Sequence, residues 1–267
     1  MVDSKLHDDN LNAVEIQQRL ICQCLSRQIL VEQIVTSTSD IIKDAAKDGL
    51  AEGMLVVSES QSSGRGRGGK SFYSPPGAGI YMSFWAPYLP TNNPGMLTLA
   101  AAVAVCEAIE QLTDLKPQIK WVNDIWLGQL KVCGILAEIL STPSAVTGAV
   151  VGIGINIDKH PLPPELDSIV GALSQRELRQ FSRNQMISQV LNAFENWYMN
   201  KATADLLEAY RRRSLVLGSD LSFISEGRLE QGRGLCIDEA GHLHVLLSDG
   251  QVRILHSGEI SVRPVMM

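Results

Sequence analysis

The segment GRGRGGKS at residues 64–71, together with the two prolines after it, constrains the fold more than any other feature. Its letters match G-x-x-x-x-G-K-[ST], the loop of P-loop nucleoside triphosphatases, in which a strand enters the loop and a helix begins at the lysine. A buried strand is predicted before the loop, at MLVVSE, residues 54–59. Pro75 and Pro76 follow soon after Lys70 and Ser71, and proline and glycine are the residues that helices exclude. The sequence therefore argues against a P-loop fold.

The loop still needs a physical role, because Arg65 and Arg67 alternate with its glycines directly after a predicted buried strand. Glycine raises the entropy cost of ordering a segment, so such a loop is either a solvated turn or one that folds over a ligand. Guanidinium groups bind carboxylates and phosphates through paired hydrogen bonds and stay charged at any accessible pH. We expect a loop that closes over an anion.

The charge and cysteine content exclude several classes of protein. A net charge of −6 provides no overall positive field for nucleic acid or an anionic membrane. The five cysteines contain no C-x-x-C pair, which argues against a zinc site or a disulfide framework. The acidic start MVDSKLHDDN is no secretory signal, and no run approaches the roughly 18 apolar residues of a membrane span. The sequence predicts a cytoplasmic protein without nucleic-acid or membrane partners.

Periodicity and turn residues predict an α+β fold, with a mixed, largely antiparallel sheet and helices packed on it. Strands are expected at residues 28–35, 54–59, 80–85, 119–127, 131–140 and 146–157. Helices are expected from residue 11, from the Ser37–Ser39 cap to Gly49, across 95–112, and over 183–200 and 202–213. Short β runs between turn residues follow from about residue 215. We expect a catalytic domain at 11–213 and a small C-terminal antiparallel β-barrel at 214–267.

Four sequence blocks, in order, resemble biotin protein ligases. SQSSGRGRGGKSFYSPPGAGIYMS resembles the biotin-binding loop of that family, and KWVNDI, LKVCGILAE and GIGINI resemble the three blocks that follow it. TSTSD at 36–40 resembles the preceding segment, and the similarity extends over about residues 11–264. The resemblance implies a fold like that of class II synthetases. The stretch before TSTSD is too short for the DNA-binding module of some members, so we expect a short form without it.

The resemblance implies a two-step ligase. Biotin would be activated by MgATP to biotinyl-5′-AMP and then transferred to a lysine of a biotin carboxyl carrier protein or carrier domain of a carboxylase. Arg67 would hold the carboxylate and the α-phosphate, and Lys131 would bridge biotin and the developing phosphoryl charge, because two approaching anions need cations between them. The full set implied for biotin is Ser37, Thr38, Ser39, Gln61, Gly64, Arg65, Gly66, Arg67 and Lys131.

The resemblance also implies a nucleotide side. The residues implied for ATP are Arg67, Lys120, Asn123, Asp124, Asn156 and Arg263, with Glu259 beside the last. Trp121 and Ile135 are candidates for apolar walls. No protein ligand to magnesium is assigned, since the ion would enter with the nucleotide.

The sequence departs from the family pattern at four positions. Ser39 replaces an asparagine, Gly68 an arginine, Phe72 a tryptophan and Val122 a proline. A glycine at 68 adds freedom to the loop, and we hypothesise that it eases escape of the adenylate.

Three other functions remain alternatives at this stage. A lipoate or octanoate ligase or transferase would share the fold type. A non-catalytic biotin sensor would bind effector without releasing pyrophosphate, and a P-loop nucleoside triphosphatase would hydrolyse ATP without biotin. A homodimer is also left open.

Overall fold

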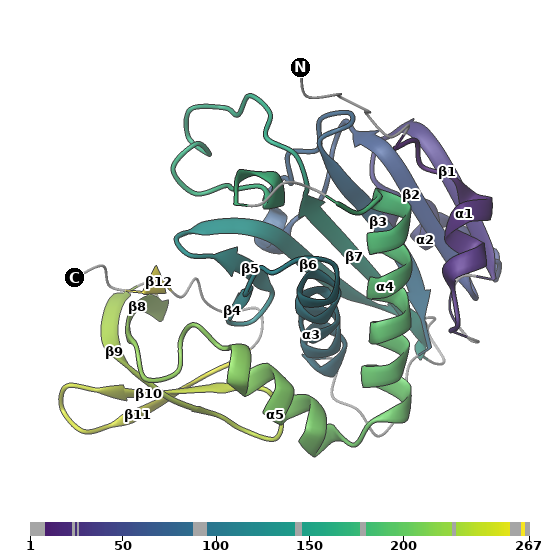
Figure 1. Cartoon of the computed structure of the whole chain (residues 1–267). Coiled ribbons are helices and arrows are strands. Elements are labelled where there is room, and N and C mark those ends of the chain that lie inside the picture. Colours follow the sequence, from purple (N-terminus) through teal and green to yellow (C-terminus); the bar gives the residue numbers. More distant parts are fainter. Residues whose placement is uncertain are drawn as a thin grey trace.

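The computed structural model describes residues 9–22, 25, 27–87, 95–141, 146–176, 180–225, 228–256 and 263–264. A seven-stranded sheet has the order β1-β2-β3-β7-β6-β5-β4 (Figure 1). Its strands are β1 (Gln28–Val35), β2 (Met54–Gln61), β3 (Gly79–Ala86), β4 (Gln118–Lys120), β5 (Asp124–Leu127), β6 (Leu130–Ser141) and β7 (Val146–Asn156). The pair β1–β2 is parallel and the other pairs are antiparallel. The predicted mixed, largely antiparallel sheet is confirmed.

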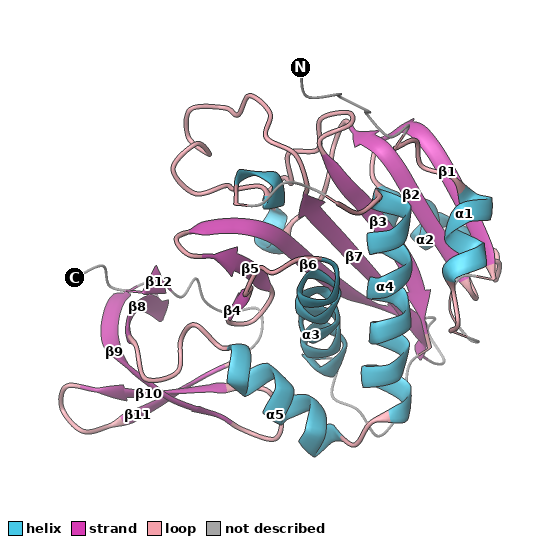
Figure 2. Cartoon of the chain, in the orientation of Figure 1, coloured by secondary structure: helices cyan, strands magenta, loops and turns pink. Residues whose placement is uncertain are grey.

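Helices cover both faces of this sheet (Figure 2). They are α1 (Ala13–Arg19), α2 (Thr38–Lys47), α3 (Gly95–Leu112), α4 (Arg183–Glu195) and α5 (Thr203–Arg213), with short helices η1 (Arg67–Gly69), η2 (Leu173–Gln175) and η3 (Asn196–Asn200). Successive residues of a strand face opposite sides. Val56 accordingly packs in the small cluster beneath α2, whereas Leu55 and Val57 pack in the main core with α3 and α4.

Helix α3 is the central core helix, as its Ala- and Val-rich sequence predicted. Its residues from Met96 to Cys106 are all buried. Helix α3 is long and apolar enough to cross a membrane by length and composition. However, 72% of it is buried inside the fold. The prediction that no run approaches a membrane span was therefore wrong for this helix in length and composition, whereas the prediction that it lies in the core is confirmed by its burial.

One predicted strand is in fact two strands and a turn. The sequence predicts one continuous strand over 119–127, but Trp121–Asn123 form a turn between β4 and β5. Trp121 and Val122 are buried in the turn instead of alternating along a strand. Local periodicity misses this, because their burial comes from packing against elements far along the chain.

The C-terminal region forms a second sheet, with the antiparallel order β11-β10-β9-β8-β12. Its strands are β8 (Asp220–Ser225), β9 (Arg228–Ile237), β10 (Leu243–Leu247), β11 (Val252–Leu255) and β12 (Arg263–Pro264). The sequence predicted a barrel, but no pairing of β11 with β12 closes the sheet within the described residues. Its inner residues Leu221, Phe223 and Val245 belong to the same core as α3. The domain boundary at 213/214 stays a prediction.

Candidate functional site

The glycine-rich loop does not form a phosphate-binding P-loop. After η1 the chain is extended at Lys70, with φ −72° and ψ 149°, and no helix begins there. Lys70 and Ser71 are both exposed. Gly68 and Gly69 have positive φ values of 64° and 75°, which explains why glycine occupies both positions. Pro75 and Pro76 predicted that no P-loop helix forms after Lys70, and this prediction is confirmed.

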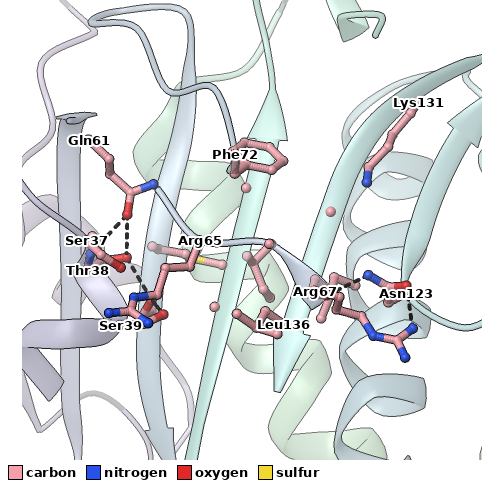
Figure 3. Close-up of a pocket in the computed structure, with 18 residues that line it drawn as sticks. Ser37, Thr38, Ser39, Gln61, Arg65, Arg67, Phe72, Asn123, Lys131 and Leu136 are labelled. Carbon is pink, nitrogen blue, oxygen red and sulfur yellow. Dashed lines mark hydrogen bonds between the residues drawn. The ribbon is translucent and has the colours of Figure 1, made fainter. Parts of the chain in front are cut away.

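Backbone hydrogen bonds fold the loop back on itself. The amide of Phe72 donates to the carbonyl of Gly64 at 2.8 Å, and the amide of Gly66 donates to the carbonyl of Lys70 at 2.7 Å. Gly64 must be glycine here, because a Cβ atom would lie 2.4 Å from the Phe72 carbonyl oxygen. The loop is thus a folded flap over strands β6 and β7, and a pocket lies between it and the sheet (Figure 3).

One end of this pocket is polar. The amide and hydroxyl of Thr38 both donate to Gln61 Oε1, at 3.0 and 3.2 Å. The hydroxyl of Ser83 lies 2.7 Å from that of Thr38 and 2.9 Å from that of Ser39. Ser37 precedes the first turn of α2 without a side-chain capping bond. Sequence reasoning placed four of these residues here and missed Ser83, whose position depends on the pairing of β2 with β3.

The opposite end of the pocket is cationic. Arg67 Nη1 donates to Asn123 Oδ1 at 3.0 Å, and Lys131 Nζ lies 2.7 Å from Asp124 Oδ1. Burial lowers the pKa of Arg67, and the nearby Asp124 carboxylate opposes that shift. A guanidinium remains charged despite such a shift, so a partly buried cation faces the pocket. Figure 3 shows Arg67, Asn123 and Lys131 together on the side away from Ser37 and Gln61.

An apolar middle separates the two ends. Gly154 has no room for a side chain, because a Cβ atom would lie 2.4 Å from the ring of Phe72. A Cβ atom at Gly134 would lie 3.1 Å from the same ring. Phe72 therefore packs on a glycine surface made by β6 and β7. The remaining apolar and glycine lining is Met82, Ile135, Leu136, Gly152 and Ile153. Sequence reasoning named Ile135, and it named GIGINI as a block that resembles the family, but it did not identify the contact of Phe72 with Gly154, although glycine in a strand often marks such a close approach.

Several predicted residues lie outside the pocket lining. Lys120 Nζ is 4.6 Å from the ring centroid of Trp126. Asn156 is buried at the end of β7 opposite Gly79. Trp121 is buried behind the site. Arg65 lines the pocket but is half exposed and pairs with Asp40 at 2.8 Å.

The last predicted residues come from the C-terminus. Glu259 and the side chain of Arg263 lie outside the described residues. Within the described part of the chain, no group of three or more His, Cys, Asp or Glu residues could hold a metal ion.

Comparisons with known proteins agree with this geometry. The sequence profile described as "Biotin/lipoate A/B protein ligase family" matches residues 30–156. The chain is 31% identical to the bifunctional ligase/repressor BirA of Bacillus subtilis, over 94% of this chain and 79% of that protein. It is 30% identical to the biotin–acetyl-CoA-carboxylase ligase of Mycobacterium tuberculosis, over 84% and 87%.

A solved structure has the same fold. Biotin protein ligase from Aquifex aeolicus, in complex with biotin and ATP, matches with a TM-score of 0.78 and 26% identity, over 90% of this chain and 100% of that one. The order of sequence blocks, the pocket beneath the flap and these relatives agree. The chain therefore belongs to the biotin protein ligases, within the biotin/lipoate A/B protein ligase family.

Proposed function

We propose that this protein is an ATP-dependent, AMP-forming biotin protein ligase. It activates biotin with MgATP to biotinyl-5′-AMP and transfers the biotinyl group to a lysine of a carboxylase carrier domain. The observation that carries the proposal is one pocket with a hydroxyl and amide end, an apolar middle and a cationic end. Family membership supports it independently.

Biotin has the same three parts in the same order. Its ureido group needs both donors and acceptors, which Ser37, Thr38, Ser39 and Gln61 offer. Its ring and alkyl chain are apolar, like Phe72, Ile135 and Leu136 in the middle of the pocket. Its carboxylate is an anion, and Arg67 and Lys131 are at the far end. A ligand that matches all three parts leaves no buried polar group unpaired.

The activation step joins two anions. A carboxylate oxygen of biotin attacks the α-phosphorus of ATP, a C–O–P anhydride forms, and the bond to pyrophosphate breaks. Arg67 and Lys131 stabilise the charge that develops on the phosphoryl oxygens, an effect that is strongest when donors are already in place and water is excluded. Gly64 and Gly66 bring the flap backbone close to the carboxylate. Asn123 and Asp124, which contact Arg67 and Lys131, are proposed to face the nucleotide.

The second step releases AMP. The neutral amine of the acceptor lysine attacks the biotinyl carbonyl carbon, an amide forms, and the C–O bond to AMP breaks. Lys120 and Asn156 do not line the pocket described above, and the side chain of Arg263 lies outside the described residues, so all three stay proposals for the nucleotide. Magnesium is proposed to enter as part of the nucleotide substrate. We also propose a cytoplasmic location, since MgATP and the carboxylase carrier domain would both be available there.

The test is a reaction of the purified protein with biotin, MgATP and an isolated carrier domain. We expect pyrophosphate release that requires biotin, and a mass increase of one biotinyl group on one carrier lysine. Three results would contradict the proposal. Labelling by lipoate or octanoate instead of biotin would identify an acyl ligase of the same fold. Biotin binding without pyrophosphate would identify a sensor, and ATP hydrolysis without biotin would identify a nucleoside triphosphatase.

A further inference from the structure

The turn between β4 and β5 is held by residues that do not line the pocket. Tyr210 of α5 is fully buried, and its hydroxyl donates to the carbonyl oxygen of Val122 at 3.0 Å. The indole Nε1 of Trp121 donates to the carbonyl oxygen of Gly241 at 3.0 Å. Gly241 lies in the turn between β9 and β10 of the C-terminal sheet. Two elements that contribute nothing to the pocket lining therefore fix this turn.

The same turn presents Asn123 toward the pocket. The carbonyl of Val122 and the amide of Asn123 belong to one rigid peptide plane, so a bond to that carbonyl also orients the next residue. Asn123 Oδ1 accepts from Arg67 at 3.0 Å, while Asn123 Nδ2 donates to the carbonyl of Ile135 at 2.9 Å. The amide of Ile135 returns a bond to the Asn123 carbonyl at 3.0 Å. Contacts thus run without a gap from Tyr210 to Arg67.

We infer that Tyr210 is a positioning residue for the activation step: its hydroxyl fixes the Val122–Asn123 peptide, and Asn123 passes that orientation to Arg67. The inference rests on the function proposed above. Burial raises the pKa of the Tyr210 phenol well above its usual value, so the group stays a donor at every working pH.

Helix α5 is itself fixed between the two sheets. The amide of Leu215, just after α5, donates to the carbonyl of Ile119 in β4 at 2.8 Å. Arg211 Nε donates to the carbonyl of Ile237 in β9 at 2.9 Å. The C-terminal sheet, α5 and β4 therefore form one support behind the turn. Through this support the C-terminal sheet acts on a pocket that none of its described residues enters.

The test compares the Tyr210→Phe variant with wild type in biotin-dependent pyrophosphate release. Removing the hydroxyl keeps the ring and deletes one hydrogen bond, so we expect kcat to fall about tenfold. KM for biotin should stay within about twofold, because the polar end of the pocket is untouched. Trp121→Phe deletes the hydrogen bond to Gly241 and should likewise lower kcat while leaving KM for biotin almost unchanged. The matched control is Tyr198→Phe, another buried tyrosine that stacks on Phe194 away from the turn.

A double variant separates positioning from general weakening. In an Asn123→Ala background the contact to Arg67 is already lost, so Tyr210→Phe should reduce kcat no further. An unchanged kcat in Tyr210→Phe, an equal fall in Tyr198→Phe, or an undiminished fall in the Asn123→Ala background would each overturn the inference. Wild-type protein that releases no pyrophosphate with biotin would instead refute the proposed function, and the positioning role with it.

Discussion

At the scale of single residues, Arg67 is the side chain on which the proposed chemistry depends most directly. It is partly buried, it carries a permanent charge, and it donates to the neutral amide of Asn123. The nearby Asp124 carboxylate compensates only part of that charge, and a neutral contact is weaker than an ion pair, so the guanidinium keeps attraction for an anion. Lys131 differs, because it is already paired with the Asp124 carboxylate.

We predict that Arg67→Ala lowers kcat for pyrophosphate release by about 10²- to 10³-fold, the usual effect of removing one preorganised donor. Arg67→Lys should recover part of the rate, since it keeps the charge but loses the planar fork. Steady-state kinetics with a pyrophosphate assay measure both. Arg27→Ala, at a side chain 61% exposed, is the control and should match wild type. A loss of less than tenfold in Arg67→Ala would contradict the assigned role.

Gly154 gives a second residue-scale prediction. An alanine there would place its Cβ 2.4 Å from the Phe72 ring and push that ring out of the pocket. We expect Gly154→Ala to weaken biotin binding at least tenfold, measured by calorimetry, with the melting temperature nearly unchanged because the ring can move.

The control for Gly154 is a double variant. If the clash acts through Phe72, then Gly154→Ala combined with Phe72→Ala should bind biotin no worse than Phe72→Ala alone. If the losses of biotin affinity from the two substitutions were additive, Gly154 would not act through the position of Phe72.

At the scale of elements, most of the sheet and helices could be predicted because each carries its own local signal. The run QILVEQIV is β1, and the apolar run over 95–112 is α3. The turn at 121–123 could not be predicted, because it is set by Tyr210 and Gly241, each about 90 or more residues away. The contact of Phe72 with Gly154 was missed for the same reason, and the closed barrel was expected from short β runs between turn residues, which do not fix how the edge strands pair.

The flap that includes Gly68 gives an element-scale prediction. Gly68 has φ 64° and nothing within 4 Å of an added Cβ, so a side chain there meets strain but no clash. We predict that Gly68→Arg slows release of biotinyl-AMP several-fold, because a less mobile backbone and an added cation both retain the anionic adenylate.

Stopped-flow measurement of adenylate release tests this prediction. Gly68→Ala carries the same backbone strain, about 1–2 kcal/mol, without the charge. It separates the two causes: slowing in both variants would indicate backbone mobility, and slowing in Gly68→Arg alone would indicate charge. Release at the wild-type rate in Gly68→Arg would contradict the hypothesis that this glycine eases escape.

At the scale of the whole molecule, one buried arginine connects regions that are far apart in the sequence. Arg183, at the start of α4, pairs with Asp9 at 2.9 Å and with Glu59 of β2 at 2.7 Å. It also donates to the carbonyl of Gly79 in β3 at 3.2 Å. The N-terminal segment, two strands and a helix therefore meet at a single guanidinium. No sequence pattern signals such a pairing, since Asp9 and Arg183 are 174 positions apart.

We predict that Arg183→Met destabilises the protein by about 3–5 kcal/mol, because it leaves two largely buried carboxylates without their cation. Denaturant unfolding measures the change. Arg253→Met, which breaks the more exposed pair with Glu230, should cost no more than about 1 kcal/mol. If both variants lost the same free energy of unfolding, burial of the Arg183 cluster would add nothing to its contribution to stability.

The contacts of the two pocket cations, Arg67 with Asn123 and Lys131 with Asp124, have a consequence for selectivity. Because Arg67 already contacts Asn123 and Lys131 already contacts Asp124, a small inorganic anion must exchange one good contact for another and gains little. A ligand that brings a carboxylate and a phosphoryl group together replaces both contacts at once. Chloride or phosphate from the buffer should therefore bind weakly in this pocket, and a ligand that carries a carboxylate and a phosphoryl group together should bind much more tightly.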